Sequence, residues 1–106
     1  MDSASLRYHA IAKVAEVSPD EPKRVVVGEQ AIALYNLGGQ IHATDDVCTH
    51  GLASLSMGFI DGDLIECPLH GGAFEIATGK AAKPPCVEDI RIFPVKVEDG
   101  TIYIGL

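Results

Sequence analysis

The stretch CTHGLASLSMGFIDGDLIECPLHGGAF, residues 48–74, holds two short motifs that each combine a thiol with an imidazole. The first motif is Cys48-x-His50 and the second is Cys67-x-x-His70. Thiolate sulfur and imidazole nitrogen are ligands that suit zinc, iron or copper better than magnesium or calcium. The stretch therefore predicts a metal centre to which two separate loops each contribute one sulfur and one nitrogen.

The composition around this stretch indicates a small folded domain. A chain of 106 residues is long enough for one domain and too short for two, so we expect a single domain over residues 1–106. Hydrophobic residues make up 47% of the chain, which allows a core without disulfide bonds. The net charge of −7 argues against nucleic acid or an anionic membrane as a partner, because phosphate groups need a basic surface.

The cysteine content and the N-terminal residues bear on the cellular location. Residues 1–17 contain no cationic segment followed by a long apolar run, and no later stretch reaches the roughly 20 apolar residues that span a bilayer. We therefore expect a cytoplasmic protein, in which thiols stay reduced. Two of the three cysteines stand beside histidines, so metal binding is favoured over a disulfide.

Alternation of apolar and polar residues predicts an all-β fold. The expected strands are residues 6–17, 23–28, 30–37, 40–45, 57–60, 63–67, 73–76, 92–98 and 101–105. Tight hairpins are predicted at Gly38-Gly39, Asp61-Gly62 and Asp99-Gly100, which are residue pairs that adopt positive φ. The two Cys/His motifs fall in loops, and residues 78–89 read as an irregular run. We therefore expect a β framework with an inserted, loop-bearing cap over about residues 46–86.

Two kinds of metal centre are compatible with four such ligands. A structural zinc site would gather all four around one ion, whereas a two-iron, two-sulfide cluster can take two Cys on one iron and two His on the other. In many zinc fingers the pairs are Cys with Cys and His with His, and the His pair lies on a helix. Here each pair is mixed, and Gly71-Gly72 disfavours a helix after His70. The spacing favours the cluster, with zinc as the alternative.

The paired motifs resemble the cluster-binding signature of Rieske proteins. With "GKAAKPP" at 79–85 and "FPVKVEDGTIYI" at 93–104, nearly the whole chain resembles the small Rieske ferredoxins of bacterial aromatic-ring-hydroxylating oxygenase systems. The resemblance implies an antiparallel β sandwich or barrel with a cluster-binding cap and one [2Fe-2S] cluster per chain. It also implies that Cys48 and Cys67 bind one iron and that His50 and His70 bind the outer iron.

Further residues are expected to surround this cluster: Gly51, Leu52, Leu69, Gly71, Gly72, Phe74 and Pro85. The glycines would let the backbone approach closely and direct N–H groups at sulfur, while Leu52, Leu69 and Pro85 would shield the cluster and form an apolar contact rim. Cys86 is interpreted as a small buried hydrophobic residue, with the alternative that it lies against the cluster.

The resemblance and the remaining residues together predict an electron carrier rather than an enzyme. An oxygenase needs a second iron held by two His and a carboxylate, and only His9 and His42, far apart, remain for it. No G-x-G-x-x-G fingerprint for NADH is present. We expect a monomer that accepts an electron from a flavin-containing reductase and passes it to a terminal oxygenase of aromatic hydrocarbon catabolism. The alternatives are a small subunit of a nitrite-reductase-type complex, a structural zinc module and a fragment of an oxygenase.

We predict a low reduction potential. High-potential Rieske proteins resembling this chain have a Ser and a Tyr hydroxyl where this chain has Gly72 and Phe74, and an interloop disulfide where it has Ala53 and Leu69. Fewer hydrogen-bond donors leave the more negative reduced state less stabilised. A redox titration is expected to give a midpoint near the bottom of the Rieske range, about −150 mV, and a value well above zero would contradict this. Gly72→Ser or Phe74→Tyr should raise the midpoint if the new hydroxyl reaches a sulfur.

Overall fold

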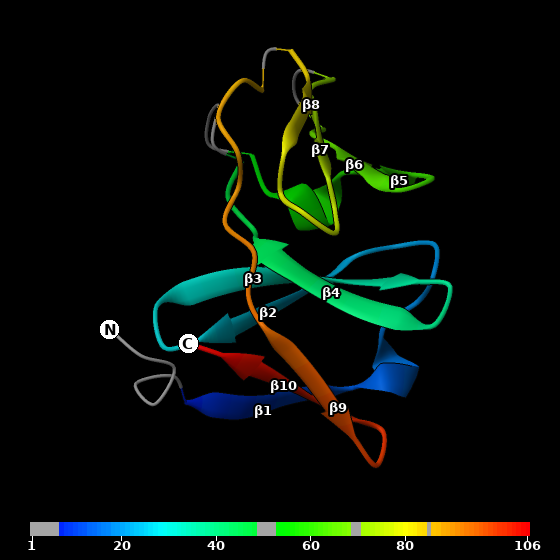
Figure 1. Ribbon diagram of the computed structural model, residues 1–106, viewed down its shortest axis with the longest axis vertical. Helices are drawn as coiled ribbons and strands as arrows, with labels where there is room; N and C mark the ends of the chain where they lie inside the picture. The colour runs from blue at the N-terminus through cyan, green and yellow to red at the C-terminus, as the bar shows by residue number, and fades with distance from the viewer. Residues whose placement is uncertain (1–6, 49–52, 69–70, 85) are drawn as a thin grey trace.

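The computed structural model describes residues 7–48, 53–68, 71–84 and 86–106. Its strands form three antiparallel sheets with the orders β1-β10-β9, β2-β3-β4 and β5-β6-β7-β8 (Figure 1). The strands of the first two sheets are β1 (Tyr8–Lys13), β10 (Thr101–Gly105), β9 (Val95–Glu98), β2 (Lys23–Val27), β3 (Gln30–Leu37) and β4 (Gln40–Asp45). The third sheet contains β5 (Phe59–Asp61), β6 (Leu64–Glu66), β7 (Ala73–Glu75) and β8 (Ala81–Lys83). The predicted all-β, antiparallel fold is confirmed.

Helical structure in the described residues consists of two 3₁₀ turns, η2 (Val14–Glu16) and η3 (Leu55–Met57). Neither is long or apolar enough to cross a membrane. The sheet β5–β8 lies at one end of the molecule, above the two framework sheets (Figure 1). The division into one domain with a cap over about residues 46–86 stays a prediction.

Strand β3 is buried on both faces because it lies between two hydrophobic cores. Ile32 and Leu34 point into the core between the framework sheets, where they meet Ile102 and Ile104 of β10. Their neighbours Ala33 and Tyr35 point the opposite way, since side chains alternate along a strand, and join the core beneath the cap sheet. Burying each large apolar side chain stabilises the fold by about 1.5–3 kcal/mol. The alternation of this strand therefore couples the framework to the cap.

Two of the three predicted hairpin turns have the position and the backbone conformation that their residues predict. Gly38 and Gly39 have φ values of 62° and 94°, and Asp99 and Gly100 have values of 52° and 77°. These two turns are where the sequence places them. In the third hairpin Asp61 still belongs to β5 and pairs with Leu64, so the turn residues are Gly62 and Asp63, one position later than predicted.

Two predicted strands are longer than the observed ones. One is shortened by a helical turn that follows it, and the other by a proline that precedes it. The first ends at Lys13, because the 3₁₀ turn η2 follows and carries the chain to buried Val17. The strand predicted at 92–98 begins at Val95, because Pro94 has no N–H to donate to a ladder. Ile92 makes only an isolated bridge with Thr44.

The sheet β5–β8 contains one strand that local pattern did not predict. Residues 81–83, placed in an irregular run, form β8 and pair with β7. Alanine and lysine are poor strand formers, so this pairing depends on the neighbouring strand rather than on local preference. The predicted strand at 57–60 also begins later, at Phe59, because η3 occupies Leu55–Met57.

A buried carboxylate fixes the point where the chain leaves the framework for the cap. Asp46 is 1% exposed and accepts hydrogen bonds from Arg24 Nε at 3.1 Å and from the Ser56 amide at 2.8 Å. Its own amide donates to the carbonyl of Ala31 at 3.1 Å. Asp46 thus ties β2 and β3 to the start of the Cys48 loop and to η3.

We predict that Asp46→Ala lowers the free energy of unfolding by about 2–3 kcal/mol, because the Ser56 amide loses its acceptor in a buried place and Arg24 loses its partner. The control is Glu98→Ala, which removes an exposed ion pair with Lys96 at 3.9 Å and should change the stability by less than about 1 kcal/mol. Urea unfolding followed by circular dichroism measures both, and equal losses would contradict a special role for Asp46.

Candidate metal centre

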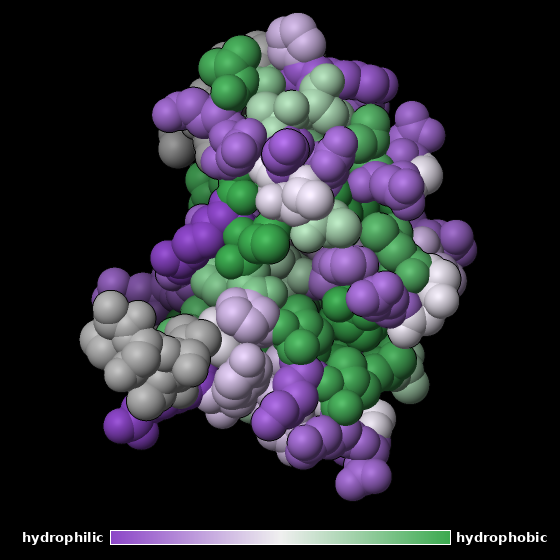
Figure 2. Space-filling model, in the orientation of Figure 1, coloured by the Kyte–Doolittle hydropathy of each residue, from purple (hydrophilic) through white to green (hydrophobic). Residues whose placement is uncertain are grey.

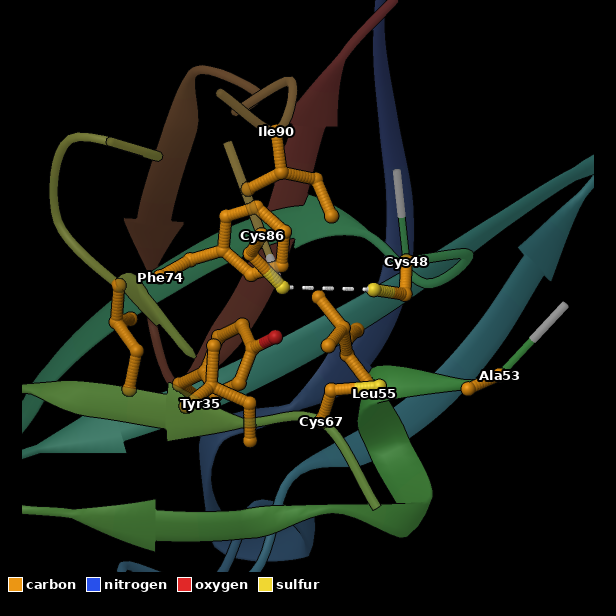
Figure 3. Close-up of a cluster of buried hydrophobic side chains, with 11 residues drawn as sticks. Tyr35, Cys48, Ala53, Leu55, Cys67, Phe74, Cys86 and Ile90 are labelled. Carbon is orange, nitrogen blue, oxygen red and sulfur yellow. Dashed lines mark hydrogen bonds between the residues drawn. The ribbon is translucent and has the colours of Figure 1, made fainter. Parts of the chain in front are cut away.

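The two motif cysteines come from different loops and meet in one apolar core. Cys48 follows β4 and is 2% exposed, and Cys67 follows β6 and is 1% exposed. Both belong to the core cluster that includes Leu55 and Phe74 (Figure 3). The structure therefore brings together the two sulfur positions that lie nineteen residues apart in the sequence.

Each of the two loops is closed in the same way. The Cys48 amide donates to the carbonyl of Ala53 at 2.9 Å, and the Cys67 amide donates to the carbonyl of Gly72 at 2.7 Å. In both loops the bond runs from the cysteine to the residue five positions later. The same backbone hydrogen bond therefore follows the cysteine of each motif.

Several predicted site residues lie outside the described residues: His50, Gly51, Leu52, Leu69, His70 and Pro85. The two imidazole ligands and the apolar rim therefore stay predictions. Of the predicted surroundings, the described residues are Gly71, Gly72 and Phe74.

The two glycines after the second motif have different roles. Gly71 has φ of 72°. Its amide was expected to point at a sulfur, but it donates to the carbonyl of Cys67 at 3.2 Å. Gly72 is buried, and a Cβ on it would lie 2.5 Å from the Cys86 sulfur and 3.1 Å from the Cys86 amide nitrogen. Gly72 does permit a close backbone approach, as predicted, but the approach is to the Cys86 segment.

Two aromatic side chains fill the core beside the cysteines. Phe74 is fully buried and belongs to the same core cluster as Cys86 (Figure 3). Tyr35 is fully buried too; its hydroxyl pairs with Thr44 Oγ1 at 2.9 Å, and that oxygen donates to the carbonyl of Asp45 at 2.8 Å. Burial raises the pKa of Tyr35 well above its usual value, so its hydroxyl stays protonated and donates to Thr44. The sequence analysis did not single out Tyr35, whose only signal was its place in an apolar strand.

Cys86 is buried, as predicted, and it lies against a motif cysteine. It is 3% exposed, and its sulfur is 3.8 Å from the sulfur of Cys48. Burial raises the pKa of the Cys86 thiol to about 12, and the hydrogen bond with Cys48 adds to this effect. Within the described residues no three His, Cys, Asp or Glu side chains are grouped so that they could hold a metal ion.

The chemistry of this donor set fits the sulfur side of a cluster. A metal-binding cysteine must be a thiolate, and an apolar core disfavours a negative charge unless a cation neutralises it. Cys48 and Cys67 are buried in such a core, on two loops of matching geometry. Bound iron would supply the missing positive charge.

Comparison with known proteins identifies the family. The model of the Rieske [2Fe-2S] domain matches residues 7–94. The chain belongs to the Rieske [2Fe-2S] family. The ferredoxin component of the naphthalene 1,2-dioxygenase/salicylate 5-hydroxylase systems of Ralstonia sp is 50% identical over 91 residues, covering 82% of this chain and 88% of that protein.

Solved Rieske structures share the fold over nearly the whole chain. The Sphingomonas yanoikuyae B1 ferredoxin is 44% identical with a TM-score of 0.91, covering 94% of this chain and 99% of the other. A chain in the complex of reduced oxygenase and oxidized ferredoxin in carbazole 1,9a-dioxygenase is 44% identical with a TM-score of 0.86, covering 92% and 91%.

These findings confirm the predicted cofactor and class of function. The chain carries a Rieske-type [2Fe-2S] cluster, which excludes the zinc alternative. It is an electron-carrying ferredoxin component of an aromatic dioxygenase system, and the prediction that it is not itself the catalytic oxygenase is confirmed.

The packing around Gly72 changes the expectation for substitutions there. Gly72→Ser would place a Cβ against Cys86 before its hydroxyl could reach a sulfur, so it is a poor test of hydrogen bonding. We predict that Gly72→Ala lowers the free energy of unfolding by about 1–3 kcal/mol, since overpacking a tight site forces shifts. Adding Cys86→Ala should recover part of this loss, because the closest clash is with the sulfur.

Gly71→Ala is the matched control. A Cβ on Gly71 would meet no other atom, so the alanine variant has no clash. Its positive φ should lower the free energy of unfolding by only about 1–2 kcal/mol through backbone strain. Cys86→Ala should not rescue it. Urea unfolding of the single and double variants gives the coupling energy for each pair, and zero coupling between positions 72 and 86 would contradict the packing described here.

Proposed function

We propose that Cys48 and Cys67 bind one iron of the cluster and that His50 and His70 bind the other. The observation that supports this assignment is the burial of Cys48 and Cys67 in one core, each with its amide bonded to the carbonyl of the residue five positions later. When bound, the cluster supplies a centre that accepts and releases one electron.

The protein supplies a dry and rigid environment for the two sulfurs. The core around them is made of apolar side chains such as Leu55 and Ile65, which exclude water. The Tyr35 hydroxyl donates to Thr44 Oγ1, so its proton is engaged in this bond. The low midpoint potential predicted from the sequence remains our expectation, because Gly72 and Phe74 offer no hydroxyl.

We infer that this chain accepts an electron from a flavin-containing reductase and passes it to a terminal ring-hydroxylating oxygenase, acting as a monomer in the cytoplasm. The complex of oxygenase and ferredoxin in carbazole 1,9a-dioxygenase supports the oxygenase as a partner. Such encounters need weak, short-lived complexes, with interfaces typically below about 1,200 Å².

The surface of the cap suits a transient contact. Hydrophilic side chains cover much of it on the face shown in Figure 2, with single hydrophobic residues between them. Val87, next to Cys86, is 80% exposed, and Val47, next to Cys48, is exposed as well. We infer that these two valines extend the apolar rim predicted from Leu52, Leu69 and Pro85.

Acidic residues form the second part of the proposed docking surface. These acidic residues are Asp61, Asp63, Glu66, Glu88 and Asp89, all of which are exposed except the half-buried Glu66. Such charges attract a basic patch on a partner and accelerate association, an effect that salt screens.

The ligand assignment predicts which substitutions remove the cluster. Cys48→Ser and Cys67→Ser should lose iron and acid-labile sulfide, whereas Cys86→Ser, the matched control, should keep both. His50→Cys or His70→Cys should lower the midpoint potential or prevent assembly, because a charged thiolate replaces a neutral imidazole. Metal and sulfide analysis with paramagnetic resonance after dithionite measures this, and an unchanged spectrum and midpoint in the histidine variants would refute the assignment.

Reconstitution tests the carrier function itself. With a candidate reductase and oxygenase, the wild-type protein and the surface control Glu98→Ala should both couple NADH consumption to hydroxylated product, whereas Cys48→Ser should not. The rate should fall as salt is added. Product formation that needs no ferredoxin would contradict the carrier function, and salt-independent rates would contradict the acidic docking surface.

A further inference from the structure

Cys86 is a third cysteine that the ligand set does not use, yet its sulfur lies at the proposed site. It follows β8 on the segment that leads back to the framework. Its sulfur is 3.8 Å from that of Cys48, within hydrogen-bonding distance for two sulfurs (Figure 3). The two residues are 38 positions apart in the sequence, so the contact is made only by the fold.

A second and independent contact places the same sulfur against the other ligand loop. A Cβ on Gly72 would lie 2.5 Å from Cys86 Sγ, so the glycine leaves the space that the sulfur fills. Gly72 also accepts the hydrogen bond that closes the Cys67 loop. The Cys86 amide donates to the carbonyl of Lys83 at 3.1 Å, which anchors the segment to β8. One buried sulfur therefore touches both loops that carry the proposed sulfur ligands.

The direction of the sulfur–sulfur hydrogen bond follows from the ligand role of Cys48, so this inference rests on the proposed function. A thiolate bound to iron has no proton and can only accept. We propose that Cys86 is a positioning residue that donates its S–H to the sulfur of Cys48. When the carrier gains one electron, no proton moves and no bond breaks; the proton stays on Cys86 and stabilises the added negative charge.

This role supplies a donor that the sequence analysis did not find. The hydroxyl donors of high-potential Rieske proteins are absent at Gly72 and Phe74, and the Tyr35 hydroxyl is engaged by Thr44. Cys86 provides a hydrogen bond in the same region from a different segment. S–H is a weaker hydrogen-bond donor than O–H, so this bond raises the midpoint potential less than the hydroxyl donors of high-potential Rieske proteins would. The bond therefore agrees with a low potential.

Comparing Cys86→Ala with Cys86→Ser tests the proposal. Both remove the sulfur, but only serine keeps a donor, so a pure packing role would affect both alike. In cluster-loaded proteins of equal iron and sulfide content, Cys86→Ala should lower the equilibrium constant for reduction about three- to tenfold, a tenfold change being about 59 mV for one electron. Cys86→Ser should stay at the wild-type value or above it. An alanine variant equal to wild type, or equal shifts in both variants, would overturn the proposal.

A measurement on the wild-type protein keeps the proposal testable if the variants do not load. The chain has three cysteines, and two of them are the proposed ligands, so the loaded protein should have a single S–H group. Its Raman S–H stretch should be one band, shifted below the frequency of an unbonded thiol. A band at the unbonded frequency, or no band, would overturn the proposal. Two or more S–H bands would instead refute the ligand assignment, which metal analysis of Cys48→Ser tests separately.

Discussion

Burial of β3 on both faces is the constraint on which the rest of the structure depends. Its alternating side chains supply Ile32 and Leu34 to the core between the framework sheets, and Ala33 and Tyr35 to the core beneath the cap. A strand with one solvated face could stabilise only one of these cores. Because the same strand belongs to both, the loops that carry Cys48 and Cys67 are held against the framework rather than tethered to it by a flexible linker.

Three segments that are far apart in the chain meet at the core to which β3 contributes Ala33 and Tyr35. Asp46 anchors the start of the first loop through Arg24 and the Ser56 amide, and the second loop is closed by the bond from Cys67 to Gly72. The segment after β8 brings Cys86 into contact with both. An electron carrier makes and breaks no covalent bonds, so what its fold contributes is a dry, rigid setting and the hydrogen bonds around sulfur that set its potential.

Local pattern predicted three framework strands at their observed bounds and failed to predict one short strand, β8. The predicted bounds of β3, β4 and β10 agree with the structure, because their alternating apolar residues and the glycines of their turns are local signals. The short strand β8 was missed, and Asp46 and Tyr35 were not noticed. Each of these depends on partners elsewhere in the chain: β7 for the strand, and Arg24 and Thr44 for the side chains.

The sequence by itself predicted the chemistry of the centre, since the two Cys/His motifs set out the types and the spacing of the proposed ligands, and it determined the all-β class through side-chain alternation. Only the tertiary structure decided that Cys86 reaches Cys48, that Gly72 makes room for its sulfur, and that the Tyr35 hydroxyl pairs with Thr44. The physical reason is that covalent neighbours fix which groups a loop can offer, whereas contacts between distant segments arise from packing in a shared core.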